Sequence, residues 1–171
     1  MAEFSPWIVE RLSKRHDRTK FSCGEAVLDA YLKKYAGQNE RLNVARHYVA
    51  VRAESPLVFG YYSLSAGSVD WENLPAEAGK KLPKYPVSVA HLGRLAVDRT
   101  AQGQRLGELL LLDALSRVVR LAEQIGIQAV EVVAATASAK RFYEKYGFLS
   151  LLDDAQHLYV AVTTLRKLGI A

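Results

Sequence analysis

The chain has a single cysteine and no long apolar run among its 171 residues, and each absence excludes a class of protein. Cys23 has no second cysteine to pair with and no histidine at zinc spacing, so neither a disulfide-stabilised scaffold nor a structural metal site is expected. No apolar run approaches the roughly 20 residues that span a membrane, and the N-terminus lacks a basic-then-apolar signal pattern. We therefore expect a cytoplasmic protein without a membrane segment.

The length and composition fit one folded domain. A chain of 171 residues can bury roughly 70% of the surface that its unfolded form exposes, which is enough for a substantial core. Hydrophobic residues make up 50% of the chain and charged residues 24%, as in globular rather than disordered proteins. No internal repeat, low-complexity tract or linker is found, so a single domain over residues 1–171 is predicted.

Basic residues outnumber acidic ones and gather in three places. The formal net charge is +5 at pH 7. Such an excess favours a polyanionic partner, although charge alone leaves a merely solvated basic surface equally open. The three clusters lie at Arg11–Lys20, at Lys33, Lys34, Arg41 and Arg46, and at Lys80–Lys84.

Hydrophobic periodicity predicts strands that alternate with helices. Ser22 and Glu25 have capping-box spacing ahead of a helix that Gly37 ends or interrupts. The longest helix begins near Gln104 and stops at Gly126. Strands are predicted over 7–12, 47–52, 57–66, 87–98, 127–133 and 157–162, and another strand is predicted after Gly147. Further helical segments are predicted over 38–45, 136–146 and 163–168. Residues 70–86 are predicted to form a long surface excursion. This order predicts a mixed α/β sheet packed by helices.

The strongest functional signal is the passage from the strand at 95–98 through the glycine-containing turn at 99–107 into the longest helix. A strand that delivers such a turn onto a helix N-terminus leaves unpaired backbone N–H groups converging on one point, where the helix dipole also favours negative charge. This predicts a phosphate site. The turn lacks the three glycines of the dinucleotide fingerprint and the Lys-Ser/Thr pair of a P-loop, and a plain turn remains the alternative.

A second motif lies at 136–148, Thr-Ala-Ser-Ala-Lys-Arg-Phe-Tyr-Glu-Lys-Tyr-Gly-Phe, which reads as a short helix that closes on a glycine. Together the two motifs resemble the GNAT superfamily of acyl-coenzyme A-dependent N-acetyltransferases. That family has a phosphate loop Arg/Gln-x-x-Gly-x-Gly/Ala and, later, a run Asn-x-x-Ala-x-x-x-Tyr-x-x-x-Gly-Phe. Gln102 and Gly107 match the ends of the loop, and the run is matched by Ala139, Tyr143, Gly147 and Phe148. The motifs occur in the family's order, and the resemblance covers the whole chain.

The resemblance implies the GNAT fold, a central mixed and splayed β-sheet flanked by helices, with acetyl-coenzyme A as co-substrate and no metal. It implies that the pantetheine arm lies between the strands at 87–98 and 127–133, where a main-chain N–H would stabilise the oxyanion. Tyr143, with an ordinary pKa near 10, would protonate the departing thiolate, and simple packing is its alternative role. The implied coenzyme-binding residues are Leu95, Ala96 and Val97 on the strand and Gln102, Gly103, Gln104, Arg105, Leu106 and Gly107 in the loop.

Two positions depart from the family's motifs. Arg105 stands where the family has its middle glycine, so we expect a backbone conformation there that is open to a side chain, and a guanidinium that can reach a phosphate. Thr136 stands where an asparagine contacts the pantetheine arm, and the favoured interpretation is an N-cap. Tyr146 is assigned to packing. The strand histidines are interpreted as satisfied sheet residues rather than catalysts, and they are His47, His91 and His157.

A closer resemblance narrows the acceptor. The segments 21–36, 93–98 and 107–115 look like the GNAT toxins of bacterial toxin–antitoxin modules, which acetylate the amino acid on charged tRNA and block translation. This resemblance implies aminoacyl-tRNA as acceptor, a small DNA-binding antitoxin as partner and, as is common among these toxins, a homodimer. An α-amine, with a pKa of about 7.7 to 8, has a large neutral fraction at pH 7 and needs no strong base, unlike a lysine near 10.4.

Three competing hypotheses stay open on the sequence. A GNAT enzyme for a small or protein amine would share every catalytic residue, but an acidic acceptor cleft is expected for it. A nucleic-acid-binding module would explain the charge and leave the phosphate loop and Tyr143 without use. A GNAT scaffold without activity would result if Arg105 blocked the coenzyme.

Overall fold

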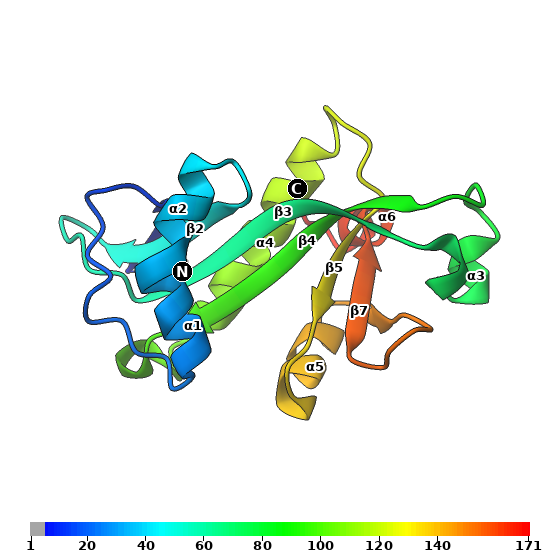
Figure 1. The fold of residues 1–171 in the computed structure, drawn as a ribbon. Coiled ribbons are helices and arrows are strands. Elements are labelled where there is room, and N and C mark those ends of the chain that lie inside the picture. Colours follow the sequence, from blue (N-terminus) through cyan, green and yellow to red (C-terminus); the bar gives the residue numbers. More distant parts are fainter. Residues whose placement is uncertain (1–5) are drawn as a thin grey trace. The chain divides into compact units, whose positions relative to one another are not determined.

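The computed structural model describes residues 6–171, in which strands and helices follow the predicted order (Figure 1). The strands are β1 (Trp7–Arg11), β2 (Arg46–Arg52), β3 (Gly60–Val69), β4 (Val87–Val97), β5 (Ala129–Val133), β6 (Leu149–Ser150) and β7 (His157–Ala161). The α-helices are α1 (Ala26–Ala30), α2 (Ala36–Arg41), α3 (Ala76–Gly79), α4 (Leu106–Leu121), α5 (Ala137–Glu144) and α6 (Val162–Lys167). A π-helical turn η1 (Tyr31–Tyr35) and two 3-10 turns, η2 (Trp71–Asn73) and η3 (Arg99–Ala101), complete the elements of this part of the chain.

The strands of residues 6–171 form a seven-stranded mixed sheet in the order β1-β2-β3-β4-β5-β7-β6. β1, β2 and β3 pair antiparallel, with Trp7 opposite Arg52 and Tyr48 opposite Tyr62. β4 pairs with β5 in parallel over three positions, ending with His91 opposite Glu131. β7 pairs antiparallel with both β5 and β6. The mixed α/β architecture predicted from the sequence is confirmed.

The chain divides into two compact units, of which the first comprises Met1–Ser65 and Arg94–Ala114. Its core joins the helical rod of α1, η1 and α2 to the strands through buried side chains such as Leu32 and Tyr61. Gly60 lies where β3 passes the start of α4. A Cβ at this position would lie 2.9 Å from Leu110 Cδ1 and 3.2 Å from the Ala96 carbonyl oxygen, so a larger residue would force these neighbours to shift.

The second unit comprises Ala66–Gly93 and Leu115–Ala171 and has a separate core. Strand residues Val87, Val89 and Ala129 pack there with Leu74 and Leu151 from the connections. The excursion over 70–86 is confirmed as mostly irregular, with the short helices η2 and α3 inside it. The Trp71 indole N–H donates to the Gly79 carbonyl at 3.0 Å, which ties these two turns together.

Several predicted helix boundaries are wrong, and contacts within the fold explain them. The capping box at Ser22 does not form, because the Ser22 N–H donates to Asp98 at 2.8 Å and the N-cap position falls on Glu25. Gly37 does not end the first helix, since α2 includes it and the helical rod continues to Arg41 through the π-helical turn. The longest helix ends at Leu121, five residues before Gly126, in a series of turns.

Within 6–171 no helix is long and apolar enough to cross a membrane. Residues 1–5, which contribute to the expectation that no signal pattern is present, lie outside the described part.

Candidate active site

The predicted phosphate loop is built on the end of β4, in the first unit. Asp98, which is 8% exposed, caps the turn η3, accepting from the Thr100 N–H at 3.0 Å and the Thr100 hydroxyl at 2.6 Å. Its other oxygen accepts from the Ser22 N–H, and the Arg99 N–H donates to the Ser22 carbonyl at 2.8 Å. Hydrogen bonds to these donors hold the pKa of Asp98 below its ordinary value although burial opposes ionisation. The turn is therefore held rigidly before α4 begins.

The Gln102 side-chain amide bonds to main-chain carbonyls beside the loop. Its Nε2 donates to the carbonyls of Cys23 and Val97, each at 3.1 Å. Gln104 Nε2 likewise donates to the Thr100 carbonyl at 3.3 Å. These side chains turn toward main-chain carbonyls, so the groups left to face an anion are backbone N–H groups.

The helix α4 supplies those N–H groups. The Leu109 N–H donates to the Arg105 carbonyl at 3.1 Å at the start of this helix, so the N–H groups of Leu106, Gly107 and Glu108 precede the intrahelical ladder. Leu106 is 1% exposed and anchors the first turn in the core. A Cβ at Gly107 would meet only Val97 Cγ2, at 3.8 Å, so the approach to the helix N-terminus is open. This geometry is that of an anion site at a helix N-terminus.

The backbone at Arg105 is unusual for a residue with a side chain. Arg105 has φ of +63°, in the left-handed region that favours glycine and that residues with a side chain enter less often. Gly103 also has a positive φ, of +78°. The Arg105 guanidinium bonds to both oxygens of Glu108, at 2.9 and 3.2 Å, and its side chain is 81% exposed. The Arg105 side chain is therefore largely exposed and engaged with Glu108.

The strand residues predicted to line the pantetheine arm lie directly before this loop. Ala96 is buried, and Leu95 and Val97 are half-buried on β4. The Val97 carbonyl accepts from Gln102, which fixes the end of the strand to the loop. The structure thus brings all nine predicted coenzyme-binding residues, Leu95–Val97 and Gln102–Gly107, into one unit.

Tyr143 lies on α5, in the second unit. Thr136 caps this helix, its hydroxyl accepting from the Ala139 N–H at 3.0 Å, so the N-cap interpretation is confirmed. The Tyr143 ring is 7% exposed and packs 5.3 Å from the Phe142 ring and 5.4 Å from the Phe148 ring. Burial raises the pKa of Tyr143 to about 12. The phenol is therefore fully protonated at neutral pH.

A buried acid in the second unit was missed on the sequence. Glu131 on β5 is 8% exposed and binds the rings of both His91 and His157, and Asp153 binds the other nitrogen of His157 at 2.9 Å. Burial opposes the charge on Glu131, but hydrogen bonds from the two histidines hold its pKa below the ordinary value. A carboxylate inside the apolar run Ala-Val-Glu-Val-Val was the available signal.

The histidines are satisfied sheet residues, as predicted. His47 is fully buried, with Nε2 at 2.7 Å from the Tyr31 hydroxyl and Nδ1 beside Glu40. Burial lowers the pKa of His47 and keeps the ring neutral, although Glu40 opposes this. Within the described residues, no group of three or more His, Cys, Asp or Glu side chains is arranged to hold a metal ion.

Comparison with known proteins agrees with this geometry. The acetyltransferase (GNAT) domain model matches residues 24–167, and the chain belongs to the GNAT acetyltransferase family. A curated relative, the tRNA-acetylating toxin of Mycobacterium tuberculosis, is 39% identical over 92% of this chain and 93% of its own length.

Solved structures of toxins share the fold. A tyrosine-to-phenylalanine variant of KacT superposes with a TM-score of 0.91 at 28% identity, covering 96% of this chain and 99% of that one. AtaT complexed with acetyl-methionyl-tRNAfMet superposes with a TM-score of 0.90 at 28% identity, covering 95% and 99%. AtaTR bound with acetyl-coenzyme A matches with a TM-score of 0.84 at 28% identity, covering 96% and 98%. The GNAT fold predicted from the two motifs is therefore confirmed.

Proposed function

We propose that this chain, as a single N-acetyltransferase domain over 1–171, transfers an acetyl group from acetyl-coenzyme A to the α-amino group of aminoacyl-tRNA, and so acts as a toxin that blocks translation. The observation that carries the proposal is the rigid turn that leads β4 into the N-terminus of α4, in a chain 39% identical to a tRNA-acetylating toxin. The relatives AtaT and AtaTR are seen with acetylated tRNA and with acetyl-coenzyme A, respectively.

Coenzyme binding is assigned to the main chain of the loop. The N–H groups of Leu106 and Gly107 suit a pyrophosphate because they lie at the positive end of a 16-residue helix. Gln102 acts by holding the loop, and Arg105 stays at its rim, paired with Glu108. The β4 residues Leu95–Val97 are proposed to run beside the pantetheine arm, with one N–H aimed at the carbonyl oxygen on which charge develops.

Tyr143 is proposed as the proton donor. The coenzyme supplies the acetyl group as a thioester. The acceptor nitrogen forms the new C–N bond as the C–S bond breaks, and the Tyr143 hydroxyl donates to the sulfur as it becomes a thiolate. The released ammonium proton passes to solvent, which restores the tyrosine. A pKa of about 12 keeps the hydroxyl in its donating form throughout the neutral range.

The acceptor and partners follow from charge and similarity. An α-amine on an ester is neutral enough at pH 7 to attack without a dedicated base, and a net charge of +5 suits a polyanionic acceptor. We propose a cytoplasmic location, a small DNA-binding antitoxin and a homodimer. In support, AtaT has been solved with the C-terminus of the antitoxin AtaR.

One mass-spectrometric comparison tests the function. The purified chain is incubated with acetyl-coenzyme A and either total charged tRNA or a panel of polyamines and other small amines. An acetyl group on the amino acid released from tRNA, with none on the panel, is the expected result. Acetylation confined to the small amines would refute the tRNA assignment and leave the GNAT chemistry intact.

A further inference from the structure

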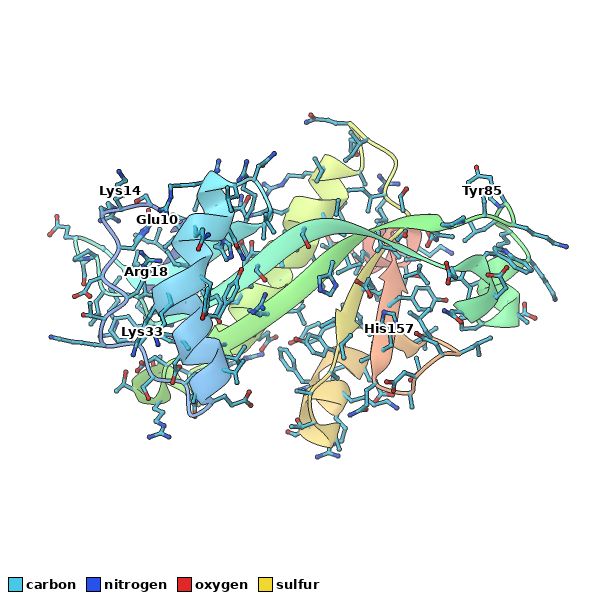
Figure 2. All side chains as sticks on the ribbon, in the orientation of Figure 1. Glu10, Lys14, Arg18, Lys33, Tyr85 and His157 are labelled. Carbon is cyan, nitrogen blue, oxygen red and sulfur yellow. The ribbon has the colours of Figure 1, made fainter. Side chains whose placement is uncertain are left out.

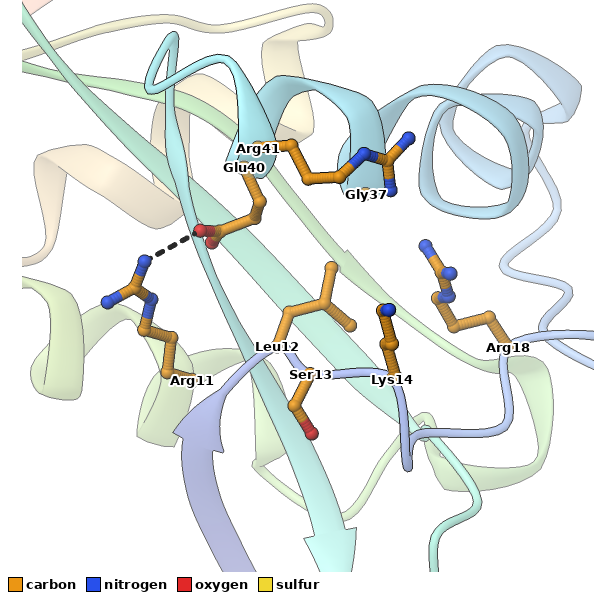
Figure 3. A pocket seen from close by; sticks show the side chains of 8 residues that line it. All are labelled: Arg11, Leu12, Ser13, Lys14, Arg18, Gly37, Glu40 and Arg41. Atoms are coloured by element: carbon orange, nitrogen blue, oxygen red, sulfur yellow. Dashed lines mark hydrogen bonds and ion pairs between the residues drawn. The ribbon is translucent and has the colours of Figure 1, made fainter.

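A basic pocket lies in the first unit, away from the coenzyme loop. It has a volume of about 470 Å³ and is formed between the end of β1, the connection that follows it and α2 (Figure 3). Figure 2 shows Lys14 and Arg18 on that connection and Lys33 on the neighbouring helical rod. Its lining residues are Arg11, Leu12, Ser13, Lys14, Arg18, Gly37, Glu40 and Arg41.

Two arginines converge at the glycine of this pocket. A Cβ built on Gly37 would lie 3.5 and 3.6 Å from the Arg18 guanidinium nitrogens and 3.6 Å from Arg41 Nη1. Arg18 is held in place because its Nη1 donates to the Leu32 carbonyl, in the π-helical turn, at 3.0 Å. Both guanidinium groups therefore crowd the same space over the bare backbone of Gly37, and Lys14 points into it as well (Figure 3).

The single acid of the pocket is already engaged. Glu40 binds Arg11 at 3.1 Å and Arg46 at 3.2 Å, and it accepts from the His47 N–H at 2.6 Å. Lys14, Arg18 and Arg41 have no carboxylate within ion-pair distance among residues 6–171. Three cations thus face one space without a counterion. Like charges held together repel, and an anion between them removes that repulsion.

We propose that this pocket binds a backbone phosphate of the nucleic-acid acceptor, at a distance from the acetylated end. This inference rests on the proposed function and names the place where the RNA is held. A tetrahedral phosphate offers oxygens in several directions and can accept from two guanidinium forks and an ammonium together, whereas a planar carboxylate is matched by one fork. Further exposed cations nearby in the sequence, such as Arg15 and Lys20, suit the repeating charge of a polyanion.

The coenzyme does not supply this anion. Gln102 of the phosphate loop bonds to Cys23, at the start of the segment that enters α1, and Gly37 lies fourteen residues further along, in α2. The rod begins at Ala26, so at about 1.5 Å per residue its eleven steps to Gly37 separate the two anion sites by about 16 Å. The phosphates of coenzyme A are clustered at one end of that molecule. A second, longer polyanion is therefore needed to fill the pocket.

A pair of variants isolates the charge from the space. Gly37→Asp places a carboxylate among the guanidinium groups, and Gly37→Asn fills the same volume without the charge. Fluorescence anisotropy with uncharged tRNA, over a range of salt concentrations, measures binding without any need for acetylation. We expect Gly37→Asp to weaken tRNA binding at least tenfold and to reduce the slope of log binding constant against log salt concentration, here called the salt slope, by about 1 to 2. Gly37→Asn should weaken tRNA binding less than threefold. The affinity for acetyl-coenzyme A should stay unchanged in both variants.

Other outcomes separate this inference from the proposed function. If Gly37→Asp or Arg41→Ala binds tRNA with the affinity and salt slope of the wild type, the pocket is not a phosphate site. That conclusion would hold even if the chain still acetylated charged tRNA. If the wild type binds a polyglutamate peptide and Gly37→Asp abolishes that binding without affecting tRNA binding, the pocket binds an acidic protein segment. That result would overturn the nucleic-acid assignment. Pocket-dependent tRNA binding without tRNA acetylation would support the pocket and refute the proposed function.

Discussion

At the scale of single residues, Tyr143 carries the sharpest prediction. Tyr143→Phe removes one hydroxyl and keeps the ring that packs on Phe142 and Phe148, so the fold should survive with little loss of stability. A positioned general acid typically contributes about 10²–10⁴-fold. We expect kcat to fall within this range while the Kd for acetyl-coenzyme A stays near wild type. Single-turnover kinetics and calorimetry measure the two quantities.

Tyr146→Phe is the matched control, since it makes the same chemical change three residues further on. Because the pKa of Tyr143 is about 12, wild-type turnover should show no loss from tyrosine ionisation up to about pH 9. If the Tyr143→Phe rate stays within about threefold of wild type, Tyr143 is a packing residue. The proton donor is then another group or water.

At the scale of elements, the start of α4 can be tested by charge alone. Gly107→Asp would place a carboxylate at the helix N-terminus, where a Cβ meets only Val97, and Gly107→Asn is its neutral isostere. Two like charges in a partly screened site repel by about 1.4 kcal/mol or more, which is tenfold in affinity. We expect the aspartate variant to bind acetyl-coenzyme A at least tenfold more weakly than the asparagine variant. If calorimetry gives the two variants equal affinities for acetyl-coenzyme A, the loop is not part of the coenzyme site.

A second testable feature is the carboxylate of Glu131 on β5, which bonds to His91 on β4 and His157 on β7. Its lowered pKa gives stability that is present above the ordinary value of 4.5 and lost as pH falls through the folded pKa. Burial opposes the charge on His157, but Asp153 and Glu131 raise its pKa, which gives stability that is present below 6.5 and lost as pH rises through the folded pKa. The ion pair is therefore strongest between these two values.

Glu131→Gln should lower the free energy of unfolding by about 2 kcal/mol near pH 6 and by less at a second pH above the raised pKa of His157, where that ring has lost its proton. Urea unfolding at the two pH values measures the difference. Glu144→Gln, at an exposed position at the end of α5, makes the same change and should cost less than about 0.5 kcal/mol at either pH. A cost for Glu131→Gln that does not vary with pH would show that the histidine charge is not coupled to it.

At the scale of the whole molecule, the excess of positive charge predicts a salt dependence. Phosphate neutralisation releases counterions, so kcat/KM for charged tRNA should fall as salt rises from low to physiological concentration. Charge reversal of Lys33 and Lys34, exposed on the π-helical turn, should raise KM more than it lowers kcat. Reversal of the exposed pair Arg166 and Lys167 is a control with the same change in net charge. Rates that do not respond to salt would favour a small-amine acceptor.

Most elements were predictable because local patterns specify them. The stripe of leucines from Leu111 onward produced α4, and Thr136 capped α5 as its residue type predicts. The failures have a tertiary cause. Ser22 fits a capping box, but Asp98, distant in sequence, takes its N–H. Gly37 is a weak helix former, yet packing of Leu32 and Ala36 in the core carries the helix through it.

The sequence by itself determined the family, the strand-to-helix turn at 102–107 and the candidate tyrosine. These depend on short runs of residues, and the spacing within such runs can be read directly along the chain. Only the tertiary structure decided which polar groups are already occupied. Gln102 bonds to Cys23, Glu131 to two histidines and Glu40 to two arginines, and each of these partners is distant in sequence or on another element. Hydrogen bonds and ion pairs act over a few ångströms in space, so only the fold could show that Arg18 and Arg41 meet over Gly37.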